Sequence, residues 1–366
     1  MAYTAFGVND AMAVKLWSKN MAIAERAMLD IAPLIGTSSN SIIQLLPQPT
    51  KGPGDKVTYP LRARLQGDGL SENDIAEGNG EGLSIYSDAL VINELGHVVG
   101  VKSQNTIDQQ RVPFDLREQA KDALGQWWAD RLSYWFFNQV CGNLGQTNIK
   151  YTGMNATSAP TANRKCFAGT QGAVTADEGL TSSYPMTLDL IDRALTLAKV
   201  GDNLQRVRPI KIGGQDKYVC YVHPLQARDL RTNTSSGQWM DIQKFALSAR
   251  NNMDHPIYTG ALGEYNGVIL RVSQDVTLGH NSSTYAPIAT TRRAVLLGAQ
   301  AAVISYGQKG GQPNRYRWNE ELLDHKRKLE VSAWQIAGMK KAVWTSGSAG
   351  TVAQDFGTVT ISTYAA

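Results

Sequence analysis

One long helix constrains this chain more than any other part of its sequence. Pro113 stands at a first-turn position, Asp115 and Glu118 lie near the positive end of the helix dipole, and residues 113–141 would span roughly 40 Å. Its apolar side chains form a broad face that becomes nearly continuous toward the C-terminal half: Leu116, Ala120, Ala123, Leu124, Trp127, Trp128, Leu132, Trp135, Phe136 and Val140. Aromatic residues at helical spacing are typical of core packing rather than of a platform for nucleobases. We therefore expect a spine on which other elements pack.

Shorter elements on both sides of this helix predict an α+β fold. Apolar periodicity indicates further helices at 9–32, 187–200, 224–231 and 240–250. Alternation indicates strands at 57–65, 207–212, 217–223, 268–272, 293–306 and 328–336, and a β-like run at 83–101 that would pair with 57–65 as a long hairpin. Residues 142–185 lack periodicity and read as an irregular excursion or a small inserted lobe. Helices combined with a mixed sheet are typical of the α+β class.

The helix at 9–32 carries a single apolar stripe. Its seam alternates in steps of three and four residues: Val14, Trp17, Met21, Ala24, Met28 and Ile31. Such a stripe has to be covered by protein. The sequence leaves two alternatives open, because the segment could dock on its own chain or act as an arm that docks on a neighbouring subunit.

Charge is distributed unevenly along the chain. Residues 65–101 contain no Lys or Arg but seven acidic residues, whereas residues 290–345 contain ten basic residues against four acidic ones. The two stretches are either solvated faces or complementary surfaces that meet between copies of the chain. On the second reading, the candidates for a subunit interface are Asp68, Glu72, Asp74, Glu77, Glu81, Arg292, Arg293, Lys326, Arg327 and Lys328.

Composition excludes several classes of protein. The net charge of +4, from 36 basic and 32 acidic residues, is too balanced for a protein that coats nucleic acid by charge alone. No uncharged apolar run reaches the roughly 18 residues that a membrane-spanning helix needs. Cys141, Cys166 and Cys220 are widely spaced and odd in number, so we expect reduced free thiols.

The sequence carries no recognisable catalytic or ligand-binding motif. The five histidines are isolated from one another and from the cysteines, so we expect no metal site. The glycine-rich stretch 78–82 begins like a dinucleotide loop, but Leu83 stands where its third glycine belongs, so we expect no cofactor. His223 and His255 each precede a proline and read as strand-end or turn residues rather than as bases. We expect no catalytic residues.

The order of these elements resembles that of a known family. The segments that carry the likeness are GDKVTYPLRARLQGDGL (54–70), PFDLREQAKDALGQWWADRLSYWFFNQVCG (113–142), YVCYVHPLQARDL (218–230) and LLDHKRKLEVSAWQIAGMKKAVW (322–344). Together they resemble the tailed-bacteriophage major capsid proteins of the Hong Kong ninety-seven-type fold, and most closely the N-four-type family. The resemblance implies an N-terminal arm at 1–50, an extended loop at 51–104, a peripheral domain at 105–200, an axial domain at 201–290, and return strands of the peripheral domain with a C-terminal tail at 291–366.

The same resemblance implies a function. It predicts a structural virion protein, not an enzyme, that self-assembles into hexamers and pentamers of an icosahedral capsid around double-stranded DNA. The implied partners are a separate scaffolding protein, a portal protein and a decoration protein, with weak nonspecific contact to the packaged DNA and no membrane. The chain would reside in the virion, and in the host cytoplasm during assembly. Two alternatives are an encapsulin-like nanocompartment shell protein and an enzyme built on an α+β fold.

Overall fold

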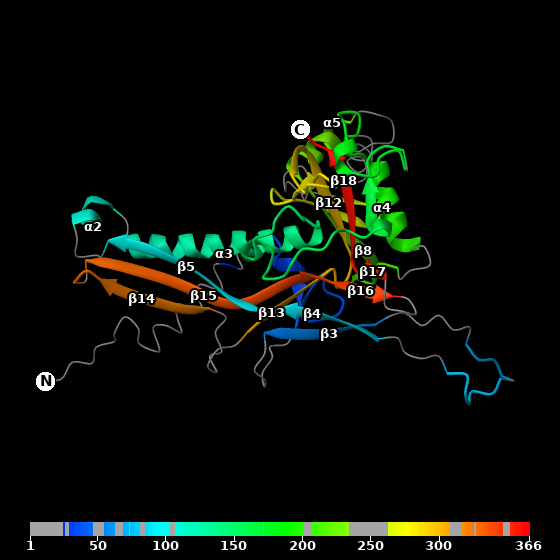
Figure 1. Ribbon diagram of the computed structural model, residues 1–366, viewed down its shortest axis with the longest axis horizontal. Helices are drawn as coiled ribbons and strands as arrows, with labels where there is room; N and C mark the ends of the chain where they lie inside the picture. The colour runs from blue at the N-terminus through cyan, green and yellow to red at the C-terminus, as the bar shows by residue number, and fades with distance from the viewer. Residues whose placement is uncertain are drawn as a thin grey trace, which may run out of the picture.

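The computed structural model describes Glu25 and residues 29–46, 55–62, 69–72, 74–80, 85–102, 107–113, 115–170, 172–200, 206–233, 263–307, 316–325, 327–346 and 352–366. A long flat lobe lies along the longest axis of the molecule, and a second lobe rises from one end of it (Figure 1). Residues 69–80 lie beyond that same end (Figure 1). The helix predicted at 240–250, and nearly all of the one predicted at 9–32, lie outside the described residues.

The predicted spine is helix α3 (Leu116–Val140). It begins three residues later than Pro113, because the Asp115 side chain accepts a hydrogen bond from the Arg117 backbone N–H at 2.8 Å and so caps the helix. A short helix, α2 (Ile107–Arg111), precedes it. Trp128 and Trp135 are fully buried on the predicted apolar face. The core role of the aromatic residues is therefore confirmed.

A six-stranded sheet packs against α3 and completes the core of the long lobe. Its strands are, in order, β1 (Ile35–Gly36), β2 (Ile43–Leu45), β13 (Ala302–Tyr306), β15 (Lys328–Lys341) and β14 (Arg317–Leu323), with β5 (Asn93–Lys102) on the free edge of β15. The predicted strand at 328–336 thus continues to Lys341. Its alternate residues, such as Val331 and Ala333, belong to the same buried cluster as the apolar face of α3.

The second lobe is built on an eight-stranded sheet. Its main path is β6 (Lys165–Phe167), β18 (Thr358–Tyr364), β12 (Pro287–Leu297), β8 (Gln215–Val222), β10 (Val268–Val272) and β9 (Gly263–Tyr265). Two further strands pair at its margins, β7 (Ile210–Ile212) with β8 and β11 (Leu278–His280) with β12. Helices α4 (Leu188–Val200) and α5 (Pro224–Thr232) contribute to its core. The predicted hairpin around Gly213–Gly214 and the strand at 268–272 are confirmed.

Two expectations about the C-terminal part of the chain are wrong. Residues 293–306 are not one strand, because β12 ends at Leu297 and β13 begins at Ala302 in the other sheet, with Gln300 at a positive φ of 55° between them. Residues 358–364 are not a tail, because β18 pairs with both β12 and β6 inside the eight-stranded sheet. In both cases the structure depends on pairing between strands that are distant in the sequence, which a local pattern does not encode.

The predicted hairpin is shorter than expected. Strand β3 (Lys56–Arg62) pairs with β4 (Ile85–Val91), and β5 then leaves for β15, so the run at 83–101 is two strands in two sheets. The Asn155 side chain marks the break, since its amide donates to the Val91 carbonyl and its oxygen accepts from the Val91 N–H, both at 2.9 Å. Tyr59 and Trp344 help form a small third core at the base of the hairpin, beside β16 (Val343–Ser346) and β17 (Val352–Asp355).

The stretch that lacks sequence periodicity, residues 142–185, folds into short elements. Residues 142–185 contain the 3₁₀ turns η2 (Ile149–Tyr151), η3 (Ala162–Arg164) and η4 (Asp177–Gly179), together with strand β6. A further 3₁₀ turn, η1 (Ala32–Leu34), precedes β1. No helix among the described residues is long and apolar enough to cross a bilayer. The three cysteines are buried free thiols, as predicted.

Candidate assembly surfaces

The acidic loop, residues 69–80, lies beyond the strands of the hairpin, and all its described residues are exposed (Figure 1). It holds three of the predicted interface residues, Glu72, Asp74 and Glu77, while Asp68 and Glu81 lie outside the described residues. Two apolar side chains are exposed among the carboxylates, Leu70 at 49% and Ile75 at 73%. Two exposed aliphatic side chains on one loop make it a candidate contact surface for another protein.

A local turn fixes the shape of the loop. The Ser71 backbone N–H and hydroxyl both donate to Asp74 Oδ2 at 2.7 Å. These hydrogen bonds, the backbone one first, lower the pKa of Asp74. The carboxylate is therefore occupied in holding the turn, whereas Glu72 and Glu77 have no structural role that the described residues reveal.

The base of the hairpin is anchored to the long lobe by Asp88. Its Oδ2 accepts a hydrogen bond from the Tyr59 hydroxyl at 2.8 Å, and its Oδ1 pairs with Lys340 Nζ at 2.5 Å. Burial, followed by the charge of Asp88, raises the pKa of Tyr59 well above its ordinary value, so the phenol stays protonated and donates. Because β15 carries Lys340, this ion pair joins the base of the hairpin to the long lobe.

Three of the ten basic residues in the stretch 290–345 form ion pairs with acidic residues of the same chain. Arg293 Nη2 pairs with Asp177 at 2.6 Å, with side chains 8% and 1% exposed. Lys341 pairs with Asp355 at 2.8 Å, both almost completely buried. Arg292 is half-buried, and burial lowers the pKa of its guanidinium. The expectation that Arg293 lies on an exposed surface is therefore wrong, because its charge is neutralised by a partner in the same chain.

Two predicted interface residues remain exposed at the far end of the long lobe. Arg327 and Lys328 lie where β15 begins, and Lys102 is the register partner of Lys328 on β5. Lys326 lies outside the described residues. Figure 1 shows this end of β15 opposite the end from which the acidic loop projects. The structure therefore separates the two predicted surfaces within one chain instead of bringing them together.

A second positively charged surface lies in the other lobe. We call it the basic hollow: it has a volume of about 620 Å³ and is lined by residues 39–40, by the last turn of α4 and by residues 206–218 around β7 and β8. Its charged lining side chains are Lys199, Arg206, Arg208, Lys211 and Asp216. No sequence motif discussed above marks this site, although its four cations fall within residues 199–211.

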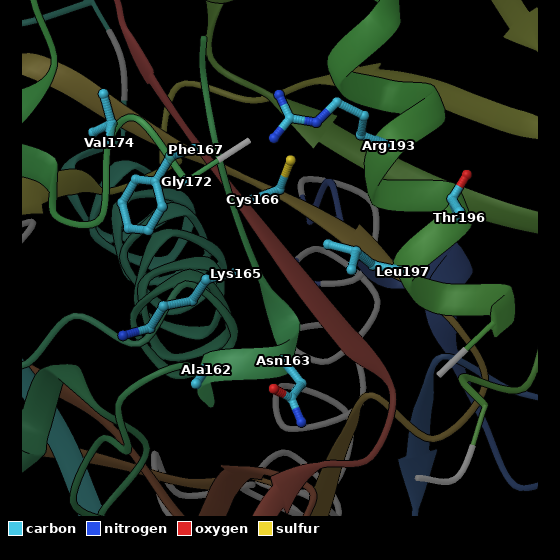
Figure 2. Close-up of a pocket in the computed structure, with 10 residues that line it drawn as sticks. All are labelled: Ala162, Asn163, Lys165, Cys166, Phe167, Gly172, Val174, Arg193, Thr196 and Leu197. Atoms are coloured by element: carbon cyan, nitrogen blue, oxygen red, sulfur yellow. The ribbon is translucent and has the colours of Figure 1, made fainter. Parts of the chain in front are cut away.

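A smaller hollow of about 360 Å³ separates β6 from α4, and its lining is shown in Figure 2. Burial raises the pKa of the Cys166 thiol in its wall, which disfavours the thiolate that a nucleophile requires. Burial also lowers the pKa of Lys165, and Arg193 Nη1 donates to the Gly169 carbonyl at 2.5 Å. The described lining contains no carboxylate or imidazole that could act as a base for either group. This arrangement does not assemble a nucleophile with a general base.

Two of the described histidines, His223 and His280, take part in hydrogen bonding that holds the fold. His223 caps α5: its Nδ1 accepts from the Leu225 N–H at 3.2 Å, and its own N–H donates to Gln226 Oε1 at 2.9 Å. Burial lowers its pKa to about 4. Its predicted role at a strand end is confirmed. Among the described residues, no group of three His, Cys, Asp or Glu side chains could hold a metal ion.

His280 lies inside the Arg293–Asp177 network. Its backbone N–H donates to Asp177 Oδ2 at 3.0 Å, and Arg293 Nη2 lies 3.4 Å from its Nε2. Burial, and then the charge of Arg293, lowers its pKa from 6.5 to about 4, against the opposing charges of Asp177 and Glu178. Lys165 acts in the same direction as Arg293. His280 is therefore neutral in the folded chain at pH 6.

This depressed pKa predicts an acid-sensitive fold. Between pH 6.5 and about 4 the unfolded chain binds a proton at His280 that the folded chain does not, so stability falls as the pH drops through that window. The His280→Gln variant is expected to lose less stability than the wild type over this pH range. It should still lose the part that comes from His223, which the variant retains. The urea midpoint of the unassembled chain, measured near pH 7.5 and near pH 5, tests the prediction. An equal loss in wild type and variant would contradict it.

Comparison with known proteins decides the family. The sequence model of the family described as phage capsid protein matches residues 5–366. The chain belongs to the phage capsid protein family. It is 24% identical to the major capsid protein of Pseudomonas phage KPP25, over 94% of this chain and 93% of that protein. It is also similar to the solved capsid of Ralstonia phage GP4, at 29% identity and a TM-score of 0.75, over 100% of this chain and 99% of that one.

A more distant capsid shares the fold alone. The capsid of cyanophage Pam1 is 20% identical, with a TM-score of 0.67 over 92% of each chain. These likenesses confirm the α+β assignment, and they are consistent with the Hong Kong ninety-seven-type fold. They favour the phage capsid protein over the nanocompartment alternative. The chain is a structural protein of the virion.

Proposed function

We propose that this capsid protein assembles into hexamers and pentamers that close an icosahedral phage head around double-stranded DNA. The observation that carries the proposal is the acidic loop, which presents Ile75 at 73% exposure beyond the cores of its own chain. A projecting loop of this kind gains burial only when another molecule covers it. The near full-length likeness to a major capsid protein supports the same conclusion.

The finer organisation is also a proposal. The peripheral domain would correspond to the long lobe of α3 and the six-stranded sheet, and the axial domain to the lobe of the eight-stranded sheet. The residue boundaries proposed from the sequence were an arm at 1–50, a loop at 51–104, and domains at 105–200, 201–290 and 291–366. Strand pairing and packing support several changes. Strand β5 joins the long lobe, whereas β6, α4, β12 and β18 belong to the lobe of the eight-stranded sheet.

The proposed partners follow from the role of a shell. A scaffolding protein would guide closure, a portal protein would replace one vertex, and a decoration protein would bind outside. We propose weak, nonspecific contact with the packaged DNA, assembly in the host cytoplasm and no enzymatic activity. A net charge of only +4 supports weak contact, because tight coating of a duplex requires many neutralised phosphates.

Electron microscopy of the purified chain, with and without scaffolding protein, tests the proposed function. We expect closed shells or capsomers whose yield rises with protein concentration. The obligate contacts of such assemblies bury more than roughly 2,000 Å² each, so the shells should persist on dilution. A chain that remains monomeric at high concentration under all these conditions would overturn the proposal.

A further inference from the structure

The basic hollow has an apolar floor and a charged rim. Val207 and Tyr218 form part of the floor at 1% and 3% exposure. Lys199, Arg206 and Lys211 are exposed on the rim, and among the described residues none of the three forms an ion pair. Asp216 is the one carboxylate among the lining residues. The hollow therefore presents a positive ring around an apolar centre.

Backbone and side-chain hydrogen bonds hold the walls of the hollow in place. The Asn40 side chain donates to the Lys211 carbonyl at 3.1 Å and accepts from the Lys211 N–H at 3.0 Å. Arg208 Nη2 donates to the Ser39 carbonyl at 2.6 Å, and the Tyr218 hydroxyl donates to the Val207 carbonyl at 3.0 Å. Segments far apart in the sequence are thus joined, and the hollow exists before any partner arrives. Preformed walls reduce the entropy lost on binding.

The acidic loop is complementary to this hollow both in charge and in its apolar surface. Ile75 is an exposed apolar side chain near the middle of the loop sequence, and Glu72, Asp74 and Glu77 surround it in sequence. No Lys or Arg occurs between residues 65 and 101 to offset their charge. An aliphatic group with a negative surround matches an apolar floor with a positive rim.

We propose that the basic hollow of one capsid protein receives the acidic loop of a neighbouring copy. Ile75 would contact the floor, and Glu72 and Glu77 would face the rim lysines. The inference rests on the proposed self-assembly and identifies the surface on the neighbour that the loop contacts. Exposed aliphatic residues next to two rim lysines, Val200 at 61% and Ile212 at 46%, add apolar area that such a contact would cover.

The other exposed basic surface fits the loop less well. Lys102 at that end is already paired with Asp108 at 3.0 Å, which leaves fewer free charges around Arg327 and Lys328. Neither of the two hollows described above is lined by Arg327 or Lys328. This surface therefore serves as the matched control.

Charge reversal separates these surfaces. The loop variant is Glu72→Lys with Glu77→Lys, which leaves the Ser71–Asp74 turn intact. The hollow variant is Lys199→Glu with Lys211→Glu, where Lys211 contributes only backbone groups to the walls. The control variant is Arg327→Glu with Lys328→Glu. Shell yield is measured by sedimentation and electron microscopy, and the circular dichroism and thermal midpoint of each unassembled chain check its folding.

We expect the loop and hollow variants each to lower shell yield at least roughly tenfold, since close charge pairs across interfaces are coupled strongly. A chain that carries both pairs of substitutions should recover most of the yield. The control variant should assemble like wild type, and adding it to the loop variant should restore nothing. Rescue of the loop variant by the control substitutions, or failure of the combined chain to recover, would overturn the inference.

Mixing identifies the chain that supplies the loop. The loop variant has a positive loop and a positive hollow, and the hollow variant has a negative loop and a negative hollow. If docking occurs between copies, the two variants should sediment together as large species although neither assembles alone. Failure to co-sediment would show that each loop occupies its own hollow and would overturn the inference. Normal shells from both single variants would also overturn it, yet leave the proposed function standing.

Discussion

Asp177→Asn is expected to lower the free energy of unfolding by about 3–5 kcal/mol, because it leaves the guanidinium of Arg293 buried without its counter-ion. The pair lies at 2.6 Å with side chains 8% and 1% exposed, so solvent screens it little. Arg293 Nη1 also donates to the Gly142 carbonyl at 2.9 Å, just beyond the end of α3. The substitution therefore weakens the joint between the spine helix and the eight-stranded sheet.

Urea unfolding of the unassembled chain, followed by tryptophan fluorescence, measures the loss. Glu178→Gln is the matched control, because Glu178 is the next residue and its hydrogen bonds go to the exposed Ser282. The control is expected to change stability by less than about 1 kcal/mol. Equal losses of stability in the two variants would show that the buried Arg293–Asp177 pair does not contribute more to the free energy of unfolding than the exposed contact of Glu178.

Local sequence patterns predicted those strands that pair with a neighbour in the sequence and those helices that have a clear apolar face. Helix α3 followed from aromatic residues at helical spacing, and the β7–β8 turn followed from Gly213–Gly214. The break between β4 and β5 at Ile92 could not be predicted from the local sequence. The Asn155 side chain that binds Val91 at this break lies 64 residues away from it along the chain. Strand β18 was missed for the same reason, since its partners are distant in sequence.

The same distinction applies to the assembly surfaces. Charge alone located the acidic loop correctly as an exposed segment, because no nearby residue of opposite sign neutralises it. Charge alone failed for Arg293, whose partner Asp177 is 116 positions away in the sequence. Net charge over a window cannot distinguish a cation in solvent from one that is paired inside the fold. The four cations within residues 199–211 were a usable signal for the basic hollow, but the apolar floor beneath them required the structure.

Trp135→Ala is expected to destabilise the chain by about 3–5 kcal/mol, the range for removing a large aromatic residue from a close-packed core. Trp135 is fully buried on α3, and its indole N–H donates to the Lys150 carbonyl at 2.7 Å. Both the cavity and the orphaned carbonyl contribute to the loss. Because α3 supports the six-stranded sheet, this variant should also assemble poorly at 37 °C.

Two further variants divide that effect into its causes. Trp135→Phe keeps most of the volume but removes the donor, so it should cost about 1–3 kcal/mol. Trp127→Ala on the same helix should lower the free energy of unfolding less than Trp135→Ala does. Trp127 is only partly buried, and its ring stacks on that of the exposed His97 with 4.5 Å between the ring centroids. If Trp127→Ala and Trp135→Ala were equally destabilising in urea, the difference in burial between the two side chains would not determine their contributions to stability.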